Sequence, residues 1–295
     1  MTSDRPVLGF LGIGLMGEKM TLRLLSQGYA VHVWNFVAGK TAAVEAAGAR
    51  VHADAASVTR AAEIVLMCVL DTDAVENSVF GKGGVVEGAA AGKVLVDHST
   101  IVPDRSRAMA ERLRRETGMG WVDAPVSGGP PAAVAGQLSI MAGGEPTDIE
   151  RVRPVMGVLG QRFTAMGPPG AGQTTKFVNQ ILVCTHFAVL AEALAFAQAA
   201  GIDAARLPEA LGGGYADSPM LQRFLPRMVA RDFAPAGYAR QVLKDLDMVQ
   251  ATAKDMKVPL PMTSQAATLY RMLVARGGGE LDAIAIAKLF DRTPL

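Results

Sequence analysis

A glycine-rich turn near the start of the chain constrains the fold most strongly. The apolar run at residues 7–11 predicts a buried strand, and the spacing of apolar residues over 16–26 predicts a helix. The segment between them fits the pattern G-x-G-x-x-G, as Gly12-Ile13-Gly14-Leu15-Met16-Gly17. Between a strand and a helix this pattern is typical of a dinucleotide site, whose phosphates lie at the helix N-terminus. We therefore predict that residues 12–17 bind a dinucleotide.

The three glycines of the turn have different structural roles in such a site. Gly12 permits the tight turn, Gly14 lets the backbone approach a pyrophosphate, and Gly17 lets the helix pack on the strand. An ordinary glycine turn without a ligand is the alternative interpretation.

The residue after the expected second strand (30–34) bears on the choice of cofactor. NAD-specific sites usually place Asp or Glu here, where the carboxylate binds the ribose hydroxyls. This chain has Asn35, followed by Phe36, and the nearest cation is Lys40. Because no carboxylate would repel a 2′-phosphate, we expect NADP to be favoured over NAD. Lys40 either contacts that phosphate or belongs to a solvated helix face.

Strands and helices alternate as far as residue 166. Continuous apolar runs at 64–70 and 94–96 are typical of strands that are buried on both faces of a sheet. This alternation predicts an α/β fold whose N-terminal part is a Rossmann-type, doubly wound parallel sheet with helices on both faces. Further strands are expected at 121–124, 138–141 and 162–165, and helices at 40–47, 103–115 and 149–159.

The pattern changes after the Gly167–Gly170 segment, which marks the expected domain junction. Beyond it only helices are expected, at 174–200, 207–211, 220–230, 238–255, 264–276 and 282–290. We therefore predict two domains. The dinucleotide-binding domain occupies residues 1–166. An all-α domain for substrate binding and oligomerisation occupies 167–295 and begins with the long interdomain helix.

Composition and charge exclude several classes of protein. The 29 Lys and Arg residues nearly balance the 28 Asp and Glu residues, so binding to nucleic acid through bulk charge is not expected. Cys68 and Cys184 lie in apolar runs and are interpreted as buried thiols in a reducing compartment. The N-terminus is polar and carries no visible secretory signal, so we expect a cytoplasmic protein.

The longest apolar stretch, residues 181–200, is interpreted as a buried helix rather than a membrane span. It includes His186 and Glu192, which a bilayer would have to hide at a cost of a few kcal/mol. His186 is interpreted as a core histidine, and no metal-ligand spacing is found, so no metal is expected. Because an apolar helix with few charges needs burial on most sides, we expect a homodimer or homotetramer.

Three motifs together resemble those of one family. They are GFLGIGLMG at 9–17, DAPVSGG at 123–129 and GAGQTTKFVNQ at 170–180. In order and spacing they are similar to the β-hydroxyacid dehydrogenases, which include 3-hydroxyisobutyrate dehydrogenase and tartronate semialdehyde (2-hydroxy-3-oxopropionate) reductase. The resemblance covers essentially the whole chain and is strongest to the tartronate semialdehyde branch. It implies an NAD(P)-dependent oxidoreductase that interconverts a small β-hydroxy acid and its semialdehyde. The substrate is thus a small-molecule carboxylate.

Lys176 is the candidate general acid and base. Oxidation of an alcohol needs a base for the hydroxyl proton and a nicotinamide that accepts the hydride. Lys176 lies near the start of a strongly apolar helix, where desolvation and the helix N-terminus both favour a lowered lysine pKa. Asn179 and Gln180 follow on the same helix face, suited to bind substrate or to orient the lysine. The resemblance implies the same catalytic role for Lys176.

The segment Ser127-Gly128-Gly129 is the candidate carboxylate site. It follows an expected strand, and it offers a hydroxyl and successive backbone N–H groups to an anion. The resemblance implies that Ser127, Gly128 and Gly129 bind the acid group of the substrate, whereas an ordinary glycine-rich turn is the alternative.

Further candidates line the cofactor side of the sheet. Val69 and Leu70 end one expected strand and Thr100 follows the next, so all three lie at the carboxyl edge, where doubly wound folds bind ligands. The resemblance implies a cofactor role for Thr100 and for Lys244, which by spacing alone is a solvated charge. His98 precedes Ser99 and is a lesser candidate for a place near the nicotinamide.

Two other functions fit the same fold. One is a non-catalytic dinucleotide-binding module used for assembly, and the other is a related imine reductase. Relatives of both kinds are expected to lose the lysine that this chain retains at position 176.

Overall fold

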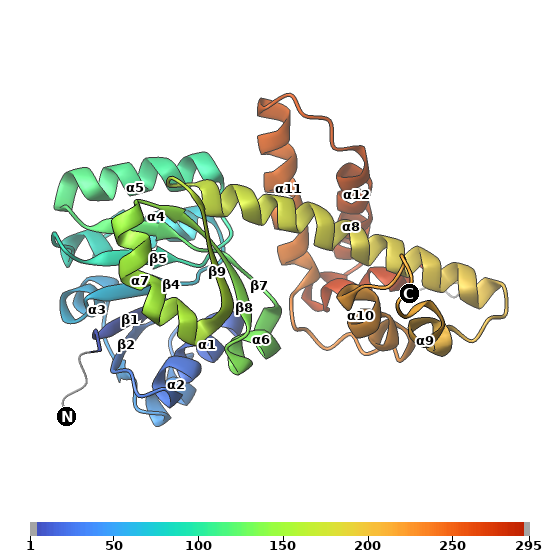
Figure 1. Cartoon of the computed structure of the whole chain (residues 1–295), viewed down its shortest axis with the longest axis horizontal. Coiled ribbons are helices and arrows are strands. Elements are labelled where there is room, and N and C mark those ends of the chain that lie inside the picture. The colour runs from blue at the N-terminus through green and yellow to red at the C-terminus, as the bar shows by residue number, and fades with distance from the viewer. Residues whose placement is uncertain (1–4, 292–295) are drawn as a thin grey trace. The chain divides into compact units, whose positions relative to one another are not determined.

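The computed structural model describes residues 5–291 and contains two compact units, which divide between Lys176 and Phe177. The first unit holds a sheet flanked by helices, and the second is helical (Figure 1). The division falls inside the long helix α8 (Ala171–Ala199), so this helix contributes residues to both units.

One sheet organises the first unit, with the strand order β3-β2-β1-β4-β5-β6-β8-β7 and with β9 paired to β8. All neighbouring pairs from β3 to β6 are parallel, as predicted. Because β1 lies between β2 and β4, the direction of strand succession reverses beside β1, which is where such folds bind ligands. The strands are β1 (Leu8–Leu11), β2 (Val31–Trp34), β3 (Arg50–Val51), β4 (Ile64–Met67), β5 (Val94–Asp97), β6 (Gly120–Asp123), β7 (Val126–Ser127), β8 (Leu138–Gly144) and β9 (Gly160–Gly167).

The far edge of the sheet departs from the predicted parallel arrangement. β8 runs antiparallel to both β6 and β7, and only β9 is parallel to β8. The chain between β7 and β8 forms just the seven-residue helix α6 (Gly129–Ala135), so it turns back without a long crossover. Helix α7 (Pro146–Leu159) then provides the crossover that makes β9 parallel to β8.

Helices cover both faces of the sheet, which confirms the doubly wound fold. Helices α1, α2, α6 and α7 pack on one apolar cluster, whereas α3, α4 and α5 pack on another. Alternation along β1 separates the two, since Leu8 and Phe10 belong to the first cluster and Leu11 to the second. The remaining helices are α1 (Leu15–Ser26), α2 (Ala42–Ala46), α3 (Ala55–Ala61), α4 (Thr72–Phe80), the 3₁₀ turn η1 (Val85–Glu87) and α5 (Pro103–Thr117).

The second unit packs helices around an apolar core of its own. Tyr270 is fully buried there, and its hydroxyl donates to the carbonyl of Ala283 at 3.0 Å. The last element, predicted as a helix over 282–290, is a 3₁₀ helix. Besides the second part of α8, the elements are η2 (Ala204–Arg206), α9 (Leu207–Leu211), α10 (Pro219–Val229), α11 (Ala239–Asp255), α12 (Pro261–Ala275), η3 (Gly278–Glu280) and η4 (Ala283–Phe290).

Helix α8 is long and apolar enough to cross a membrane, judged by length and composition alone. In its most apolar stretch 44% of the residues are buried inside the structure, and core helices of soluble proteins pass the same test. Cys184 on this helix is a buried thiol, whereas the thiol of Cys68 is half-buried.

Candidate active site

The glycine turn at the end of β1 has the geometry of a phosphate-binding turn. Gly12 has a φ of +91°, and a Cβ there would lie 2.3 Å from the carbonyl oxygen of Cys68. A Cβ on Gly17 would lie 1.9 Å from the carbonyl oxygen of Gly12, so α1 packs directly on the turn. At Gly14, by contrast, a Cβ would meet nothing within 4 Å among the described residues. The backbone at Gly14 is therefore open to a ligand.

The start of α1 suits an anion. Gly14 is the N-cap residue and has no side chain, so the first N–H groups of α1, from Leu15, Met16 and Gly17, face the turn without a side-chain cap. These N–H groups and the helix dipole favour a phosphate. The residues present thus fit a dinucleotide cofactor, whose pyrophosphate the backbone at Gly14 and the start of α1 would hold.

Asn35 braces the glycine turn instead of presenting its amide outward. Its Oδ1 accepts a hydrogen bond from the Ile13 backbone N–H at 2.8 Å, and its Nδ2 donates to the Val37 carbonyl at 2.8 Å. Phe36 next to it is 89% exposed, and Lys40 is exposed. The segment after β2 therefore offers an aromatic ring and a cation.

The ends of β4 and β5 are joined through Ser99. Its Oγ accepts from the Val69 N–H at 2.9 Å, and its own N–H donates to Asp97 Oδ1 at 2.9 Å. Leu70 is 47% exposed and Thr100 is half-buried, so both cofactor candidates are accessible to solvent at this edge of the sheet.

His98 is buried between the ends of β5 and β6. Its Nδ1 lies 2.7 Å from the Ala124 carbonyl oxygen, and because a carbonyl only accepts, Nδ1 carries the proton. Nε2 has no hydrogen-bond partner within residues 5–291. Burial lowers the pKa of His98 to about 4, so the imidazole is neutral at neutral pH.

The start of α8 is fastened to the sheet by two buried side chains, Asp123 and Gln173. Asp123 ends β6 and accepts from the N–H groups of Gly170 at 2.7 Å and Gln173 at 2.9 Å. The Gln173 side chain donates to the Ser99 carbonyl at 2.7 Å and accepts from the Ile101 N–H at 3.1 Å. Both residues lie inside the recognised motifs, but their partners are distant in sequence and were not predicted.

Lys176 lies one turn further along α8 and is buried. Its Nζ donates to the Val126 carbonyl at 2.8 Å, directly before Ser127. Gly128 and Gly129 follow with φ values of +123° and +69°, and a Cβ on Gly128 would lie 2.6 Å from that of Ala132. The structure thus brings Lys176 and the Ser127–Gly129 segment together.

Asn179, Gln180 and Lys244 are linked within the helical unit through Asp245. Asn179 Nδ2 donates to Gln180 Oε1 at 2.8 Å, and Gln180 Nε2 donates to Asp245 Oδ2 at 2.5 Å. Lys244 Nζ lies 3.1 Å from Asp245 Oδ1. Asp245 was not predicted as a site residue, and as a buried carboxylate it needs partners of this kind.

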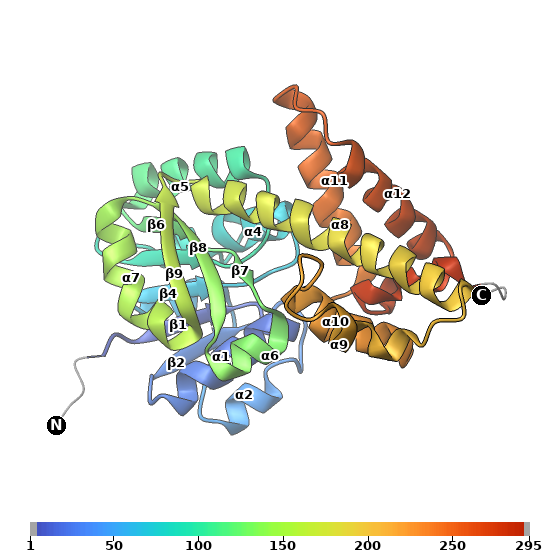
Figure 2. The ribbon, with the colours of Figure 1, turned by 45° about the vertical axis from the view of Figure 1, so that its right-hand side comes forward.

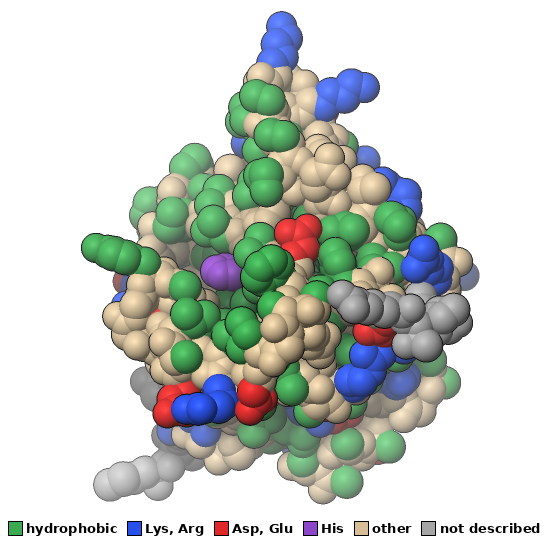
Figure 3. All heavy atoms as spheres, turned by 90° about the vertical axis from the view of Figure 1, so that its right-hand side faces the viewer, with side chains coloured by type: hydrophobic (Ala, Val, Ile, Leu, Met, Phe, Trp, Pro, Cys, Tyr) green, Lys and Arg blue, Asp and Glu red, His purple; other side chains and the backbone are tan. Residues whose placement is uncertain are grey.

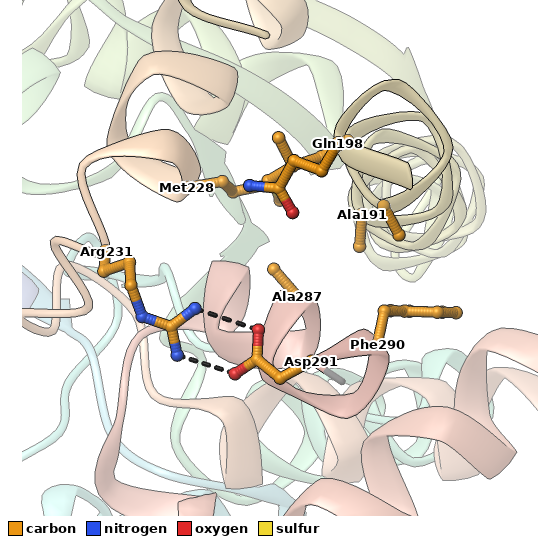
Figure 4. Close-up of a pocket in the computed structure, with 9 residues that line it drawn as sticks. Ala191, Gln198, Met228, Arg231, Ala287, Phe290 and Asp291 are labelled. Atoms are coloured by element: carbon orange, nitrogen blue, oxygen red, sulfur yellow. Dashed lines mark hydrogen bonds and ion pairs between the residues drawn. The ribbon is translucent and has the colours of Figure 1, made fainter. Parts of the chain in front are cut away.

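A separate hollow in the helical unit contains none of the predicted site residues (Figure 4). It lies between α8, α10 and η4, and the guanidinium of Arg231 binds the carboxylate of Asp291 at its edge with two contacts of 2.9 and 2.6 Å. No group of three or more His, Cys, Asp or Glu side chains within residues 5–291 is arranged to hold a metal ion.

Two family models together match most of the chain. The NAD binding domain of 6-phosphogluconate dehydrogenase matches residues 7–167, and the NAD-binding domain of NADP-dependent 3-hydroxyisobutyrate dehydrogenase matches 170–290. With the glycine turn at the centre of a doubly wound sheet, these matches define the class as NAD(P)-binding oxidoreductases.

The chain belongs to the β-hydroxyacid dehydrogenase family, as its three motifs indicated. It is 37% identical over 286 residues to 2-hydroxy-3-oxopropionate reductase of Escherichia coli (strain K12), covering 96% of this chain and 97% of the relative. It is 34% identical over 290 residues to 2-(hydroxymethyl)glutarate dehydrogenase of Eubacterium barkeri, covering 97% and 95%.

A solved structure has the same fold along its whole length. The crystal structure of 3-hydroxyisobutyrate dehydrogenase from Salmonella typhimurium matches with a TM-score of 0.87 at 28% identity, covering 96% of this chain and 99% of that one. The protein is thus an NAD(P)-dependent dehydrogenase or reductase that acts on a hydroxyl group of a small-molecule substrate.

Proposed function

We propose that the protein interconverts a small β-hydroxy acid and its semialdehyde, in the manner of 3-hydroxyisobutyrate dehydrogenase and 2-hydroxy-3-oxopropionate reductase. The observation that carries this proposal is the buried Lys176, whose Nζ is held at the Val126 carbonyl beside the Ser127–Gly129 segment. This contact supports the proposal, because a hydroxy acid requires a proton-transfer group next to an anion site.

In the oxidation direction Lys176 accepts the proton of the substrate hydroxyl, and in the reduction direction it returns that proton to the carbonyl oxygen. The bound nicotinamide exchanges the hydride with the same carbon. The Ser127 hydroxyl donates a hydrogen bond to the substrate carboxylate, and the backbone of Gly128 and Gly129 approaches the same group. The φ values of these glycines, which disfavour side chains, support that close approach.

The two amides that follow on α8 complete the proposed catalytic group. Asn179 and Gln180 are coupled to each other and, through Asp245, to Lys244. We assign the amides to substrate binding or to orientation of the lysine. We assign a role in cofactor binding to Lys244, Thr100, Val69 and Leu70.

We further propose that NADP is preferred over NAD. The support is the segment after β2, which carries Asn35 in place of a carboxylate and the exposed cation Lys40. Titration of the protein with NADPH and NADH tests this, and Lys40→Ala should weaken NADPH binding only. Tighter binding of NADH than of NADPH to the wild type would contradict the proposed preference.

The reaction is tested with a panel of small hydroxy acids, semialdehydes and imines, each with both cofactors. We expect turnover of at least one β-hydroxy acid or semialdehyde and none of the imines, because Lys176 is retained. Turnover of imines alone, or none on the whole panel with intact cofactor binding, would contradict the proposal and favour an imine reductase or an assembly module.

A homodimer or homotetramer is proposed from the exposed face of α8. Val178, Leu182, Val189 and Phe196 are 50–75% exposed, and at 100° per residue they fall within a stripe about 40° wide. Figure 3 shows one face of the molecule, on which apolar side chains are scattered among polar and charged ones. Light scattering tests this, and a monomer would overturn it. The expected cytoplasmic location stays a prediction, which cell fractionation tests.

A further inference from the structure

The carboxylate of Asp123 occupies the N-terminus of α8, the helix that carries Lys176. Its two oxygens accept hydrogen bonds from the backbone N–H groups of Gly170 and Gln173. The first N–H groups of a helix have no partner inside the helix, and the positive end of the helix dipole favours an anion there. Asp123 thus caps α8 from a strand that lies 47 residues earlier in the chain.

Gln173 fastens the same turn of α8 to a second strand end. Its side chain is fully buried, and its amide bonds both the carbonyl of Ser99 and the N–H of Ile101. This loop follows β5 and contains the cofactor candidate Thr100. One turn of α8 is therefore attached to the ends of both β5 and β6.

Steric fit allows α8 to sit directly on the sheet. A Cβ on Gly172 would lie 2.5 Å from the carbonyl oxygens of Asp123 and Met141, and a Cβ on Gly143 would lie 2.7 Å from Asp123 Oδ1. Side chains at these two positions would push the helix away from the strands. In Figure 2 the first turn of α8 accordingly begins at the end of β9 and beside the neighbouring strands.

The ionised form of the Asp123 side chain is energetically unfavourable in this buried position. Burial raises the pKa of its carboxyl to about 7, although the hydrogen bonds from the Gly170 and Gln173 N–H groups lower it. A buried group that costs stability is expected where it serves a functional site. The functional group that Asp123 serves here is Lys176, which lies three residues after Gln173 on the same helix.

We propose that Asp123 and Gln173 are positioning residues, which together clamp the first turn of α8 and so fix Lys176 Nζ beside the Val126 carbonyl. Neither residue needs to touch the substrate or the cofactor. The proposal rests on the role of Lys176 given above. Loosening the clamp should misplace the lysine while leaving the glycine turn at β1 intact.

The test uses Asp123→Asn, which replaces one acceptor oxygen by a donor, and Gln173→Met, which removes both hydrogen-bonding atoms; both keep the side-chain length. In Asp123→Asn an amide NH₂ faces a backbone N–H, so at least one bond to α8 is lost. Asp54→Asn is the matched control, because Asp54 caps α3 through the Ser57 N–H at 2.7 Å and lies outside the proposed site.

We expect amide hydrogen exchange across residues 170–176 to rise about tenfold in both clamp variants and to stay unchanged in Asp54→Asn. We expect kcat to fall by about 100-fold, the order of loss for a displacement of 1 Å in a reacting group. Substrate KM and cofactor Kd should change by less than about threefold, since a positioning role affects the transition state more than binding.

Unchanged exchange in both clamp variants would show that the clamp does not exist. Faster exchange with unchanged kcat would show that the clamp does not position Lys176, and a loss of cofactor binding together with kcat would assign these residues a general structural role. If Asp123→Asn does not fold, Gln173→Met decides the same question. A failure of the proposed reaction itself is recognised separately, because wild-type protein would then lack turnover while the exchange experiment still tests the clamp.

Discussion

Replacing the glycines of the turn one at a time should separate folding from cofactor binding. In Gly17→Ala the new Cβ would lie 1.9 Å from the Gly12 carbonyl oxygen, more than 1 Å inside the shortest distance that real contacts allow. The obstacle is backbone, which cannot swing aside as a flexible side chain can. We expect a loss of about 3 kcal/mol, a fall in Tm of roughly 6–12 °C.

Gly14→Ala should behave in the opposite way. The new Cβ would meet nothing within 4 Å among the described residues, and a φ of −99° suits alanine. Stability should therefore change by less than about 1 kcal/mol. The methyl group, however, would occupy the space through which a pyrophosphate reaches the backbone. We expect the Kd for NADPH to rise at least about tenfold, equal to about 1.4 kcal/mol.

Thermal unfolding without ligand and fluorescence titration with NADPH measure the two effects. Gly157→Ala on α7 is a matched control, because its Cβ also meets nothing within 4 Å in the described part of the chain. It should raise Tm slightly and leave cofactor binding unchanged. Wild-type NADPH binding in Gly14→Ala, or the wild-type Tm in Gly17→Ala, would show that these glycines do not have the roles given above.

Two further predictions concern buried polar groups. Because the folded-state pKa of His98 is lowered to about 4 from 6.5, its contribution to stability is present above about pH 6.5 and is lost as the pH falls toward 4. The variant His98→Asn keeps a donor for the Ala124 carbonyl but does not titrate in this range. Its free energy of unfolding in urea should therefore fall less than that of the wild type between pH 6.5 and 4, and an equal fall in both proteins would contradict this. Tyr270→Phe removes the bond to the Ala283 carbonyl and should lower the free energy of unfolding by about 1 kcal/mol, whereas an unchanged urea midpoint would show that this bond contributes nothing.

Much of the fold is encoded locally and is therefore predictable from the sequence. The continuous apolar runs at β4 and β5 and the glycines between β1 and α1 are properties of adjacent residues. Helices α3 and α4 were not predicted, because their short runs of small and polar residues carry weak periodicity. The antiparallel β8 was also missed, because strand direction depends on how the chain returns after α6.

The candidate site was predictable as a set of residues but not as a set of contacts. Lys176 and Ser127 were found by motif, whereas the Val126 carbonyl that links them is visible only in three dimensions. Asn35 was found by its place after β2, whereas its hydrogen bonds to Ile13 and Val37 are visible only in three dimensions. Asp123 and Gln173 have partners 47 to 74 residues away, which no local pattern encodes.

The role of Lys176 is tested most directly by single-turnover reduction of the best semialdehyde by NADPH. The reaction is followed by absorbance in wild type and in Lys176→Ala, with Lys254→Ala on α11 as control. With Lys176 as the proton donor, the rate constant in Lys176→Ala should fall by about 10²–10⁴-fold while NADPH still binds. The control should match the wild type. Hydride transfer at the wild-type rate in Lys176→Ala, with the cofactor bound, would show that Lys176 is not the proton donor.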